Sequence, residues 1–326
     1  MKIIYKKEAE LIIKGASILS CGGGLCYEEQ IKYLKIISME KGIKILELDD
    51  IKKFSENDIF ITASEIGPAE LPPIDKSKIP LMIDIFQKKI NKKVVGLLPV
   101  EVGQESIVFD SAVISNLPII NSDLAGLRAV PKASFNALRM QNVDFTRSPL
   151  VILTNKGDIK FFDKNVNLDQ DEKQLRTISK ISQGIIFVMG AIIKPMIVQK
   201  YLNFKSLTIL LNIGLALQKN KLEEAIPLDM VFKEKAMVSS VNRINSQGFT
   251  EKIIELKNKK HTIKLIVKNE FIELKINEFS LFNFPQLITV VDWNKKRGLS
   301  SSEITPGLVV TIYVFNPLKF WLNYSK

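Results

Sequence analysis

Residues that commonly carry acid–base, redox or metal chemistry are scarce in this chain. Its 326 residues include one histidine, His261, and two cysteines, Cys21 and Cys26. A structural zinc site needs four ligands, so these three residues cannot build one. Two cysteines make no disulfide framework and fit a reducing compartment. Because His261 lies in a strand-like run, where a surface position is expected, acid–base chemistry must rest on carboxylates, cysteine, tyrosine or lysine.

Long apolar runs are also missing. A membrane span needs about 18–20 unbroken apolar residues, and the longest apolar candidate, residues 184–193, is ended by Lys194 and Pro195. Near the N-terminus, lysines and glutamates precede the apolar part, which makes a poor signal peptide. We therefore expect a cytoplasmic protein without a membrane partner.

Arginine is rare although the chain is basic. The net charge is +11, and 40 lysines and six arginines make up the 46 basic residues. Nucleic-acid readers rely on arginine forks for phosphate and guanine, and no basic run here alternates with aromatic residues. A compositional bias toward lysine is the simpler interpretation, so no nucleic-acid partner is expected.

One stretch contains no lysine at all, between Lys93 and Lys132. It begins with a short apolar run closed by a proline (94–99), continues with helical spacing (104–116) and ends in a second apolar run (117–120). Strand, helix and strand in about thirty residues predict a βαβ unit.

Acidic residues stand where the two strands of this unit end. Glu101 follows the first strand and Asp123 follows the second. In parallel sheets, ligands gather beyond the carboxyl ends of the strands, which makes both residues candidates for a binding or catalytic site. Either one alone could equally be a solvated loop or cap residue.

A second candidate feature is the run Gly22, Gly23 and Gly24 between two expected helices, 8–20 and 27–40. Glycines let backbone N–H groups approach an anionic ligand at the start of a helix. The alternative is a plain helix cap, which needs only one glycine. Glu65, just after an expected strand at 58–63, is a further pocket candidate, with a solvated loop glutamate as the alternative.

The remaining pattern predicts two domains, as the length allows. Residues 1–165 are expected to form an α/β domain with a mostly parallel sheet, including a hairpin around Asn155-Lys156-Gly157. The polar run 163–171 marks the expected boundary. Residues 166–326 are expected to form an α+β domain, with helices to residue 219 and an alternating, β-rich segment from Met230.

The motifs of both domains resemble those of the S-methyl thiohydantoin desulfurase-like family over roughly residues 9–320. The family's Pro-x-Glu-Ile-Gly-Gly is matched by residues 99–104, and its Asp-x-Asp-x-x-Gly-Arg-Ala-x-Pro by residues 121–131 with one extra residue before Arg128. Further matches are the glycine loop, the Gly-Pro turn at 67–68, Asn269-Glu270, a Gly-Phe turn at 248–249, and Glu303. The chain departs from the family's pattern at four positions: Leu25, Gln104, Asn121 and Leu215.

The resemblance implies a hydrolase that adds water to a small cyclic amide or to the sulfur-bearing carbon of a thiohydantoin-like ring. Asp123 or Glu101 would be the general base, and the glycine loop or Arg128 would stabilise the developing negative charge. Glu65 would contribute to substrate binding, and Asn269 and Glu270 are the candidates from the second domain. No cofactor is expected, with a divalent ion on Glu65, Glu101 and Asp123 as the alternative.

The four departures leave a second hypothesis open, a non-catalytic or altered-function relative that binds a small metabolite. A small-molecule substrate is the expected partner, and a homo-oligomer and a hydantoinase-type partner protein stay open. The sharpest expectation concerns Asp123: Asp123→Asn should abolish turnover while leaving the melting temperature close to that of the wild type. The glycine loop, Glu101 and Asp123 should also meet in one cleft.

Overall fold

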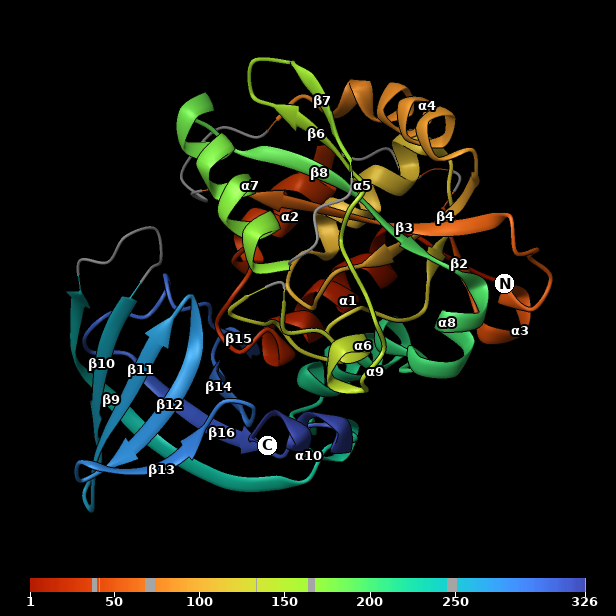
Figure 1. Ribbon diagram of the computed structural model, residues 1–326. Coiled ribbons are helices and arrows are strands. Elements are labelled where there is room, and N and C mark those ends of the chain that lie inside the picture. The colour runs from red at the N-terminus through yellow and green to blue at the C-terminus, as the bar shows by residue number, and fades with distance from the viewer. Residues whose placement is uncertain are drawn as a thin grey trace.

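The computed structural model describes residues 1–36, 40, 42–67, 74–132, 134–163, 168–244 and 251–325. Pro68 of the expected Gly-Pro turn, the Gly-Phe turn at 248–249 and part of the polar run at 163–171 lie outside these residues. Figure 1 shows two bodies, a sheet wrapped by helices and a β-rich sheet beside it. Each sheet has eight strands.

The first sheet has the strand order β1-β2-β5-β4-β3-β8-β6-β7. In chain order its strands are β1 (Lys2–Ile4), β2 (Ile43–Leu46), β3 (Asp58–Ile66), β4 (Lys93–Pro99), β5 (Ile119–Ile120), β6 (Leu150–Thr154), β7 (Ile159–Phe162) and β8 (Ile186–Ile193).

The expectation of a mostly parallel sheet is wrong. Only the central strands β2, β5, β4 and β3 are parallel to their neighbours, whereas β1, β8, β6 and β7 join by antiparallel pairs. The expectation failed because it assigned residues after 165 to the second domain. Strand β8 belongs to that part of the chain, yet it joins the first sheet by antiparallel pairing with β3 and β6. The buried run of β8 carries no sign of its direction, since a strand buried on both faces reads the same either way.

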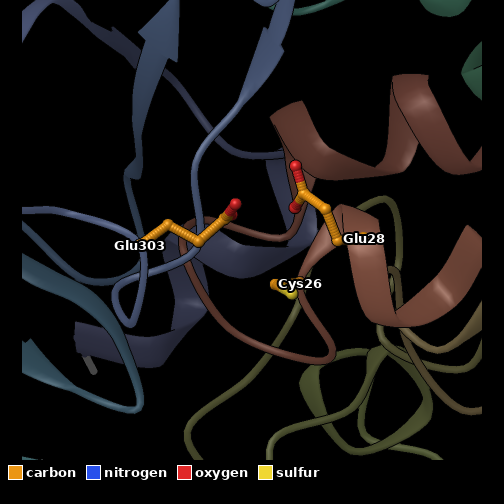
Figure 2. A group of neighbouring side chains, drawn as sticks. All are labelled: Cys26, Glu28 and Glu303. Atoms are coloured by element: carbon orange, nitrogen blue, oxygen red, sulfur yellow. The ribbon is translucent and has the colours of Figure 1, made fainter.

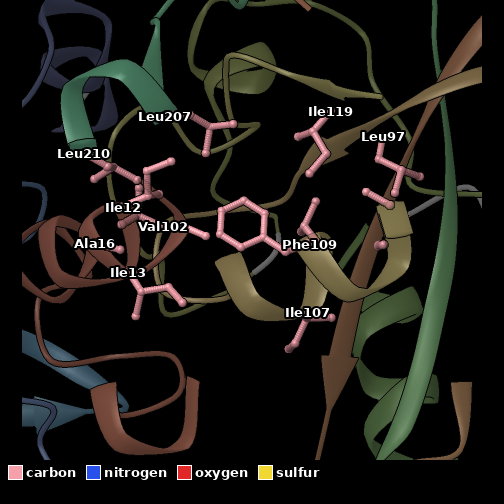
Figure 3. Packing of buried hydrophobic residues seen from close by; sticks show 14 of the residues in the cluster. Ile12, Ile13, Ala16, Leu97, Val102, Ile107, Phe109, Ile119, Leu207 and Leu210 are labelled. Carbon is pink, nitrogen blue, oxygen red and sulfur yellow. The ribbon is translucent and has the colours of Figure 1, made fainter. Parts of the chain in front are cut away.

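The βαβ unit is confirmed, with α5 (Glu105–Ser115) crossing between the parallel neighbours β4 and β5. The absence of lysine now has a physical reason. Between Val94 and Pro131 the only exposed residue is Asn116, and a lysine side chain is almost never fully buried without a partner. Figure 3 shows Phe109 of α5 in the centre of the core, among residues of α1, α9 and the strands.

Helices cover the sheet and connect it to the second body. They are α1 (Lys6–Leu19), α2 (Tyr27–Ile36), α3 (Leu48–Ile51), α4 (Ile79–Ile90), α5, α6 (Ala137–Met140), α7 (Leu168–Ser182), α8 (Pro195–Tyr201), α9 (Ser206–Gln218) and α10 (Leu222–Ala225), with 3-10 turns η1 (Lys76–Lys78) and η2 (Lys319–Ser325). None of the described helices is long and apolar enough to cross a membrane.

Helices α1 and α9 pack at very short range because a glycine faces the backbone at each side. A Cβ added to Gly15 would lie 1.9 Å from the carbonyl oxygen of Leu210, and one added to Gly214 would lie 2.0 Å from that of Leu11. Gly214 belongs to the element that resembles the family's Ile-Gly-Arg-Ala. Leu215, which replaces the arginine, is exposed on α9.

Gly15→Ala is therefore expected to destabilise the protein. The methyl group would push the two helices apart, and overpacking of this kind costs about 1–3 kcal/mol or more, which exceeds the gain of about 0.5–1 kcal/mol from alanine in a helix. Urea unfolding measures the effect. Leu215→Ala is the control and should change the free energy of unfolding little. A Gly15→Ala protein as stable as the wild type would contradict this packing.

The second sheet has the order β13-β12-β11-β10-β9-β16-β14-β15, and all of its pairs are antiparallel. Its strands are β9 (Met230–Ile244), β10 (Glu251–Lys257), β11 (Thr262–Lys268), β12 (Glu270–Ile276), β13 (Phe279–Asn283), β14 (Leu287–Asp292), β15 (Arg297–Gly298) and β16 (Val309–Phe315). Alternation of buried and less buried residues along β10 and β11 gives one core-facing side. The β-rich segment expected from Met230 is confirmed.

Candidate active site

Three segments meet where the two bodies are in contact. We call this the domain seam and define it by the glycine loop (21–25), the loop after β4 (100–104) and the start of β12 (Glu270 and Phe271). The N–H of Phe271 donates to the carbonyl of Cys21 at 2.7 Å, and that of Leu25 to the carbonyl of Gly103 at 3.1 Å. Backbone hydrogen bonds thus fix the glycine loop from both sides.

The three glycines are required by close packing at the seam. An added Cβ would lie 2.3 Å from the ring of Phe271 at Gly22, 2.4 Å from Oε1 of Glu270 at Gly23, and 2.5 Å from the carbonyl oxygen of Gly103 at Gly24. Gly22 and Gly24 also have positive φ angles, which glycine adopts without strain. The loop therefore admits Glu270 and Phe271 of the second sheet to the edge of the first domain.

Glu270 is buried at the seam, 6% exposed. Its Oε2 atom makes no hydrogen bond within the described residues, which is rare for a buried carboxylate. Burial raises the pKa of Glu270 well above its usual value, the charge of Glu101 raises it further, and Arg128 opposes both. Burial therefore favours the protonated form of Glu270.

Glu101 faces the same seam from the loop after β4 and is partly exposed. Its Oε1 accepts from Nε2 of Gln104 at 2.9 Å, and its Oε2 accepts from the N–H of Val130 at 2.9 Å. Burial raises the pKa of Glu101 to about 7 in spite of these hydrogen bonds and of the nearby charge of Arg147. Each oxygen keeps a lone pair for a further donor.

Asp123 lies in the loop after β5 but is 1% exposed. Its carboxylate accepts from the N–H groups of Gly126 at 2.5 Å and Leu127 at 2.9 Å, and from Oγ of Ser206 at 2.5 Å. Burial raises the pKa of Asp123 to about 6, and the hydrogen bond from Ser206 opposes this most. Asp123 thus organises its own loop and ties it to the start of α9, without open access for water.

Asn121 also connects the loop after β5 to the start of α9. Its Oδ1 accepts from the N–H of Thr208 at 3.1 Å, and its Nδ2 donates to Glu47 at 3.0 Å and to Oγ1 of Thr208 at 2.8 Å. This replacement of a family aspartate has a structural account, since an amide can both accept from the N–H of α9 and donate to a carboxylate.

Asp123→Asn is accordingly expected to lower stability, in contrast to the expectation from sequence. An amide presents one acceptor oxygen where three donors converge, and an unpaired buried donor costs about 1–3 kcal/mol. A drop in melting temperature tests this. Ser206→Ala, which removes one of the three donors, should cost less. An unchanged melting temperature for Asp123→Asn would contradict the structural role.

Arg128 is buried beside the seam. Its guanidinium lies 4.3 Å from the ring centroid of Phe284 and 4.9 Å from that of Trp321, its Nε donates to the carbonyl of Ala129 at 3.1 Å, and a second nitrogen donates to the carbonyl of Pro285. Burial lowers the pKa of Arg128, and the charges of Cys21, Glu270 and Glu101 raise it. Arg128 thus places a positive charge near both seam acids.

Sequence reasoning missed a second arginine at this place. Arg147 is 3% exposed, its side chain lies 3.4 Å from Oγ of Ser64, and its charge lowers the pKa of Glu101. The available signal was composition: in a chain that uses lysine for its surface charge, each of the six arginines stands out as a position where a planar donor is needed.

Glu65 is held by a charged partner and a hydroxyl partner. Its carboxylate pairs with Nζ of Lys76 at 2.9 Å and accepts from the hydroxyl of Tyr33 at 3.2 Å, while Lys76 also pairs with Asp110 at 3.1 Å. The side chains of Glu65 and Lys76 are both buried. Glu65 therefore holds a buried ion pair at the end of β3.

Asn269 forms the turn between β11 and β12 with a φ of 62°, which asparagine tolerates well. Its carbonyl oxygen accepts from Oγ of Ser301 at 3.0 Å, and the N–H of Ser301 donates to the carbonyl of Gly22 at 2.8 Å. Asn269 therefore positions the start of β12 against the glycine loop.

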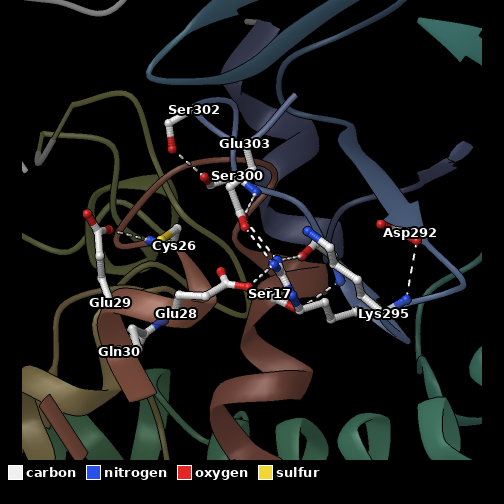
Figure 4. A network of polar contacts seen from close by, with 12 residues as sticks. Ser17, Cys26, Glu28, Glu29, Gln30, Asp292, Lys295, Ser300, Ser302 and Glu303 are labelled. Atoms are coloured by element: carbon white, nitrogen blue, oxygen red, sulfur yellow. Dashed lines mark hydrogen bonds and ion pairs between the residues drawn. The ribbon is translucent and has the colours of Figure 1, made fainter. Parts of the chain in front are cut away.

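Glu303 belongs to a separate network, which Figure 4 shows. Both of its oxygens accept from Arg297, at 2.7 and 3.0 Å, and Arg297 also contacts Glu28 of α2. One possible ligand atom from each of Cys26, Glu28 and Glu303 lies within 4.8 Å of the other two. Figure 2 shows these three side chains. Arg297 already pairs with both carboxylates, and burial raises the pKa of the Cys26 thiol to about 12, so this trio does not suit a metal ion.

Within the described ranges, Glu65, Glu101 and Asp123 form no such group either. The side chain of Gln104 lies between Glu65 and Glu101 and hydrogen-bonds to both. The carboxylate of Asp123 already accepts hydrogen bonds from its own loop and from Ser206. A cavity of about 560 Å³ opens elsewhere, between α7 and β7, and none of its lining side chains is an acid: Phe162, Gln170, Lys173, Gln174, Thr177 and Ile178.

Fold and site together define a two-sheet protein in which a glycine loop and buried acids from both sheets meet. Models of the S-Me-THD-like N-terminal and C-terminal domains match residues 7–164 and 167–325. The chain therefore belongs to the S-Me-THD-like family, as its motifs indicate.

A crystal structure of a protein from Chromobacterium violaceum has the same fold. It superposes with a TM-score of 0.75 over 97% of this chain and 91% of that one, at 15% sequence identity. No curated protein matches the chain.

Proposed function

We propose that this protein hydrolyses a small cyclic amide or thiohydantoin-like ring at the domain seam, with Glu101 as the base that activates water. The observation that carries the proposal is the pair Glu101 and Glu270. Glu101 lies in the loop after β4 and Glu270 begins β12, the charge of Glu101 acts on Glu270, and both groups have raised pKa values. Pairs of acids whose environments set different protonation states are typical of acid–base sites.

The two acids suit opposite roles. A pKa of about 7 lets Glu101 accept a proton near neutral pH, whereas burial raises the pKa of Glu270 well above its usual value, which suits a proton donor. Water would lose a proton to Glu101 and attack the ring carbon that bears sulfur. The carbon–sulfur bond would then break, and the departing sulfur would take a proton from Glu270 and leave as a thiol.

The positive charges around the pair favour this reaction. Arg128 and Arg147 both act electrostatically on the seam acids and would stabilise negative charge that develops on the ring. We favour Glu101 over Asp123 as the base because Glu101 is partly exposed and has lone pairs free, whereas three donors surround the buried Asp123.

A panel of S-methyl thiohydantoins, thiohydantoins, hydantoins and other cyclic amides tests the proposal. Release of a thiol and formation of the corresponding hydantoin, followed by mass spectrometry, are expected for at least one S-methyl thiohydantoin. Tight binding without product would instead support the second candidate, a metabolite-binding relative, which the four departures from the family's pattern favour. If no compound of the panel binds and none is turned over, both candidate functions are overturned.

A further inference from the structure

The loop after β4 carries one side chain that links the proposed base to a second, more rigid part of the first sheet. Gln104 donates from Nε2 to Oε1 of Glu101 at 2.9 Å and accepts at Oε1 from the backbone N–H of Glu65 at 3.4 Å. A carboxylate without a proton can only accept and a backbone N–H can only donate, so both contacts require the same orientation of the amide.

Gln104 lies at the start of α5, where a polar side chain could cap the helix. Gln104 is the N-cap residue of α5, yet its side chain makes no capping hydrogen bond. Polar residues at N-cap positions usually accept from the N–H groups of the first helical turn. Here the amide is directed away from the helix, toward Glu101 and Glu65.

The far end of this link is firmly held. Glu65 is the second-to-last residue of β3, which pairs with β4 on one side and β8 on the other. Its carboxylate is fixed by Lys76 and Tyr33, and Lys76 is fixed in turn by Asp110. A buried ion pair with further hydrogen bonds restricts the groups that it joins. Gln104 therefore connects Glu101 to a strand end that has little freedom to move.

We propose that Gln104 is the positioning residue of Glu101, orienting its carboxylate and stabilising its ionised form. This inference rests on the proposed function for its catalytic meaning, but the contact itself can be tested without turnover. The chain has glutamine at a position where the family's pattern has glycine, so the link is a feature of this chain's own sequence.

The charges around Glu101 come from several elements, and each bears on its protonation. Arg147 lowers its pKa and Glu172 of α7 raises it, while burial remains the largest cause. Glu101 also acts on three further groups: Glu105 of α5, Arg128 and Glu270. A Gln104 variant leaves these charged residues unchanged and removes the link itself, that is, the hydrogen bond to Glu101 and the one from the N–H of Glu65.

The test uses Gln104→Met, which keeps the length of the side chain but cannot hydrogen-bond, and Gln104→Gly, which restores the family's residue. The carboxyl band of Glu101 is titrated by infrared spectroscopy, with Glu101→Gln identifying the band. Loss of one charge-assisted hydrogen bond should move the titration midpoint upward by about one pH unit. Gln218→Met, at an exposed position of α9, is the matched control and should leave the midpoint unchanged.

If a substrate is found, the acidic limb of the profile of kcat/KM against pH should move upward by the same amount. Turnover on this limb should then fall roughly tenfold at a fixed pH. A midpoint that moves in a protein without turnover would support the positioning role while overturning the proposed function. Midpoints of both Gln104 variants that coincide with those of the wild type and of Gln218→Met would overturn the inference.

Discussion

Replacing Glu101 by glutamine is expected to lower kcat/KM for a thiohydantoin substrate by about a hundredfold or more, the usual loss when a general base is removed. The amide keeps the shape of the side chain but cannot take a proton from water. Because the change removes an acid whose pKa burial raises to about 7, it should leave the melting temperature close to that of the wild type.

The matched control is Glu56→Gln, the same substitution at an exposed glutamate, which should keep full activity. Thiol release by the two variants and the wild type is measured side by side, together with their melting temperatures. A Glu101→Gln protein that retains activity within a few fold would remove Glu101 from the mechanism, and activity would then have to depend on another group.

Stability is expected to fall as the pH rises from about 4.5 to about 8, the interval between the usual glutamate pKa and the raised pKa of buried Glu105. Glu105 is the first residue of α5, and both of its oxygens contact the N–H of Gly103, at 3.0 and 3.1 Å. Burial is the main cause of its pKa of about 8, and the charges of Asp123 and Glu101 add to it.

The direction follows from proton counting. For an acid whose pKa is raised by folding, the native state holds more protons than the unfolded state between the two pKa values. The free energy of unfolding then decreases with pH in that interval, by up to about 1.4 kcal/mol per pH unit for each such group. Its contribution is fully present below pH 4.5 and is lost as the pH passes about 8.

Glu105→Gln should remove this dependence for one group. Its amide oxygen can still accept from Gly103, and no charge has to be buried at high pH. Melting temperatures from pH 5 to pH 9 should therefore fall less steeply for Glu105→Gln than for the wild type or for the Glu56→Gln control. Parallel curves for all three proteins would contradict the burial of an ionisable Glu105.

Several helices, strands and turns of this protein could be predicted from the sequence because each depends on residues that are close together in the chain. The βαβ unit between Val94 and Ile120, the hairpin around Asn155-Lys156-Gly157 and the alternating strands after Met230 all form as expected. In each case the apolar period and the turn residues lie within the element itself.

The parts that could not be predicted depend on contacts between distant segments. Nothing within residues 186–193 indicates that β8 joins the first sheet antiparallel to β3. The same limit applies to the candidate site: the sequence marks both Asp123 and Glu101 as candidates and favours Asp123, and only the fold buries Asp123 and leaves Glu101 partly exposed. The fold also explains Gly22 and Gly23, whose close neighbours Phe271 and Glu270 lie more than two hundred residues away in the chain.

The most direct test of the account is a crystal structure with a bound hydantoin, the product expected from a thiohydantoin. We predict that the ring lies at the domain seam next to Gly23, with its atoms within hydrogen-bond distance of Glu101 and Glu270. A ring bound in the cavity between α7 and β7, or anywhere out of reach of both acids, would contradict the account.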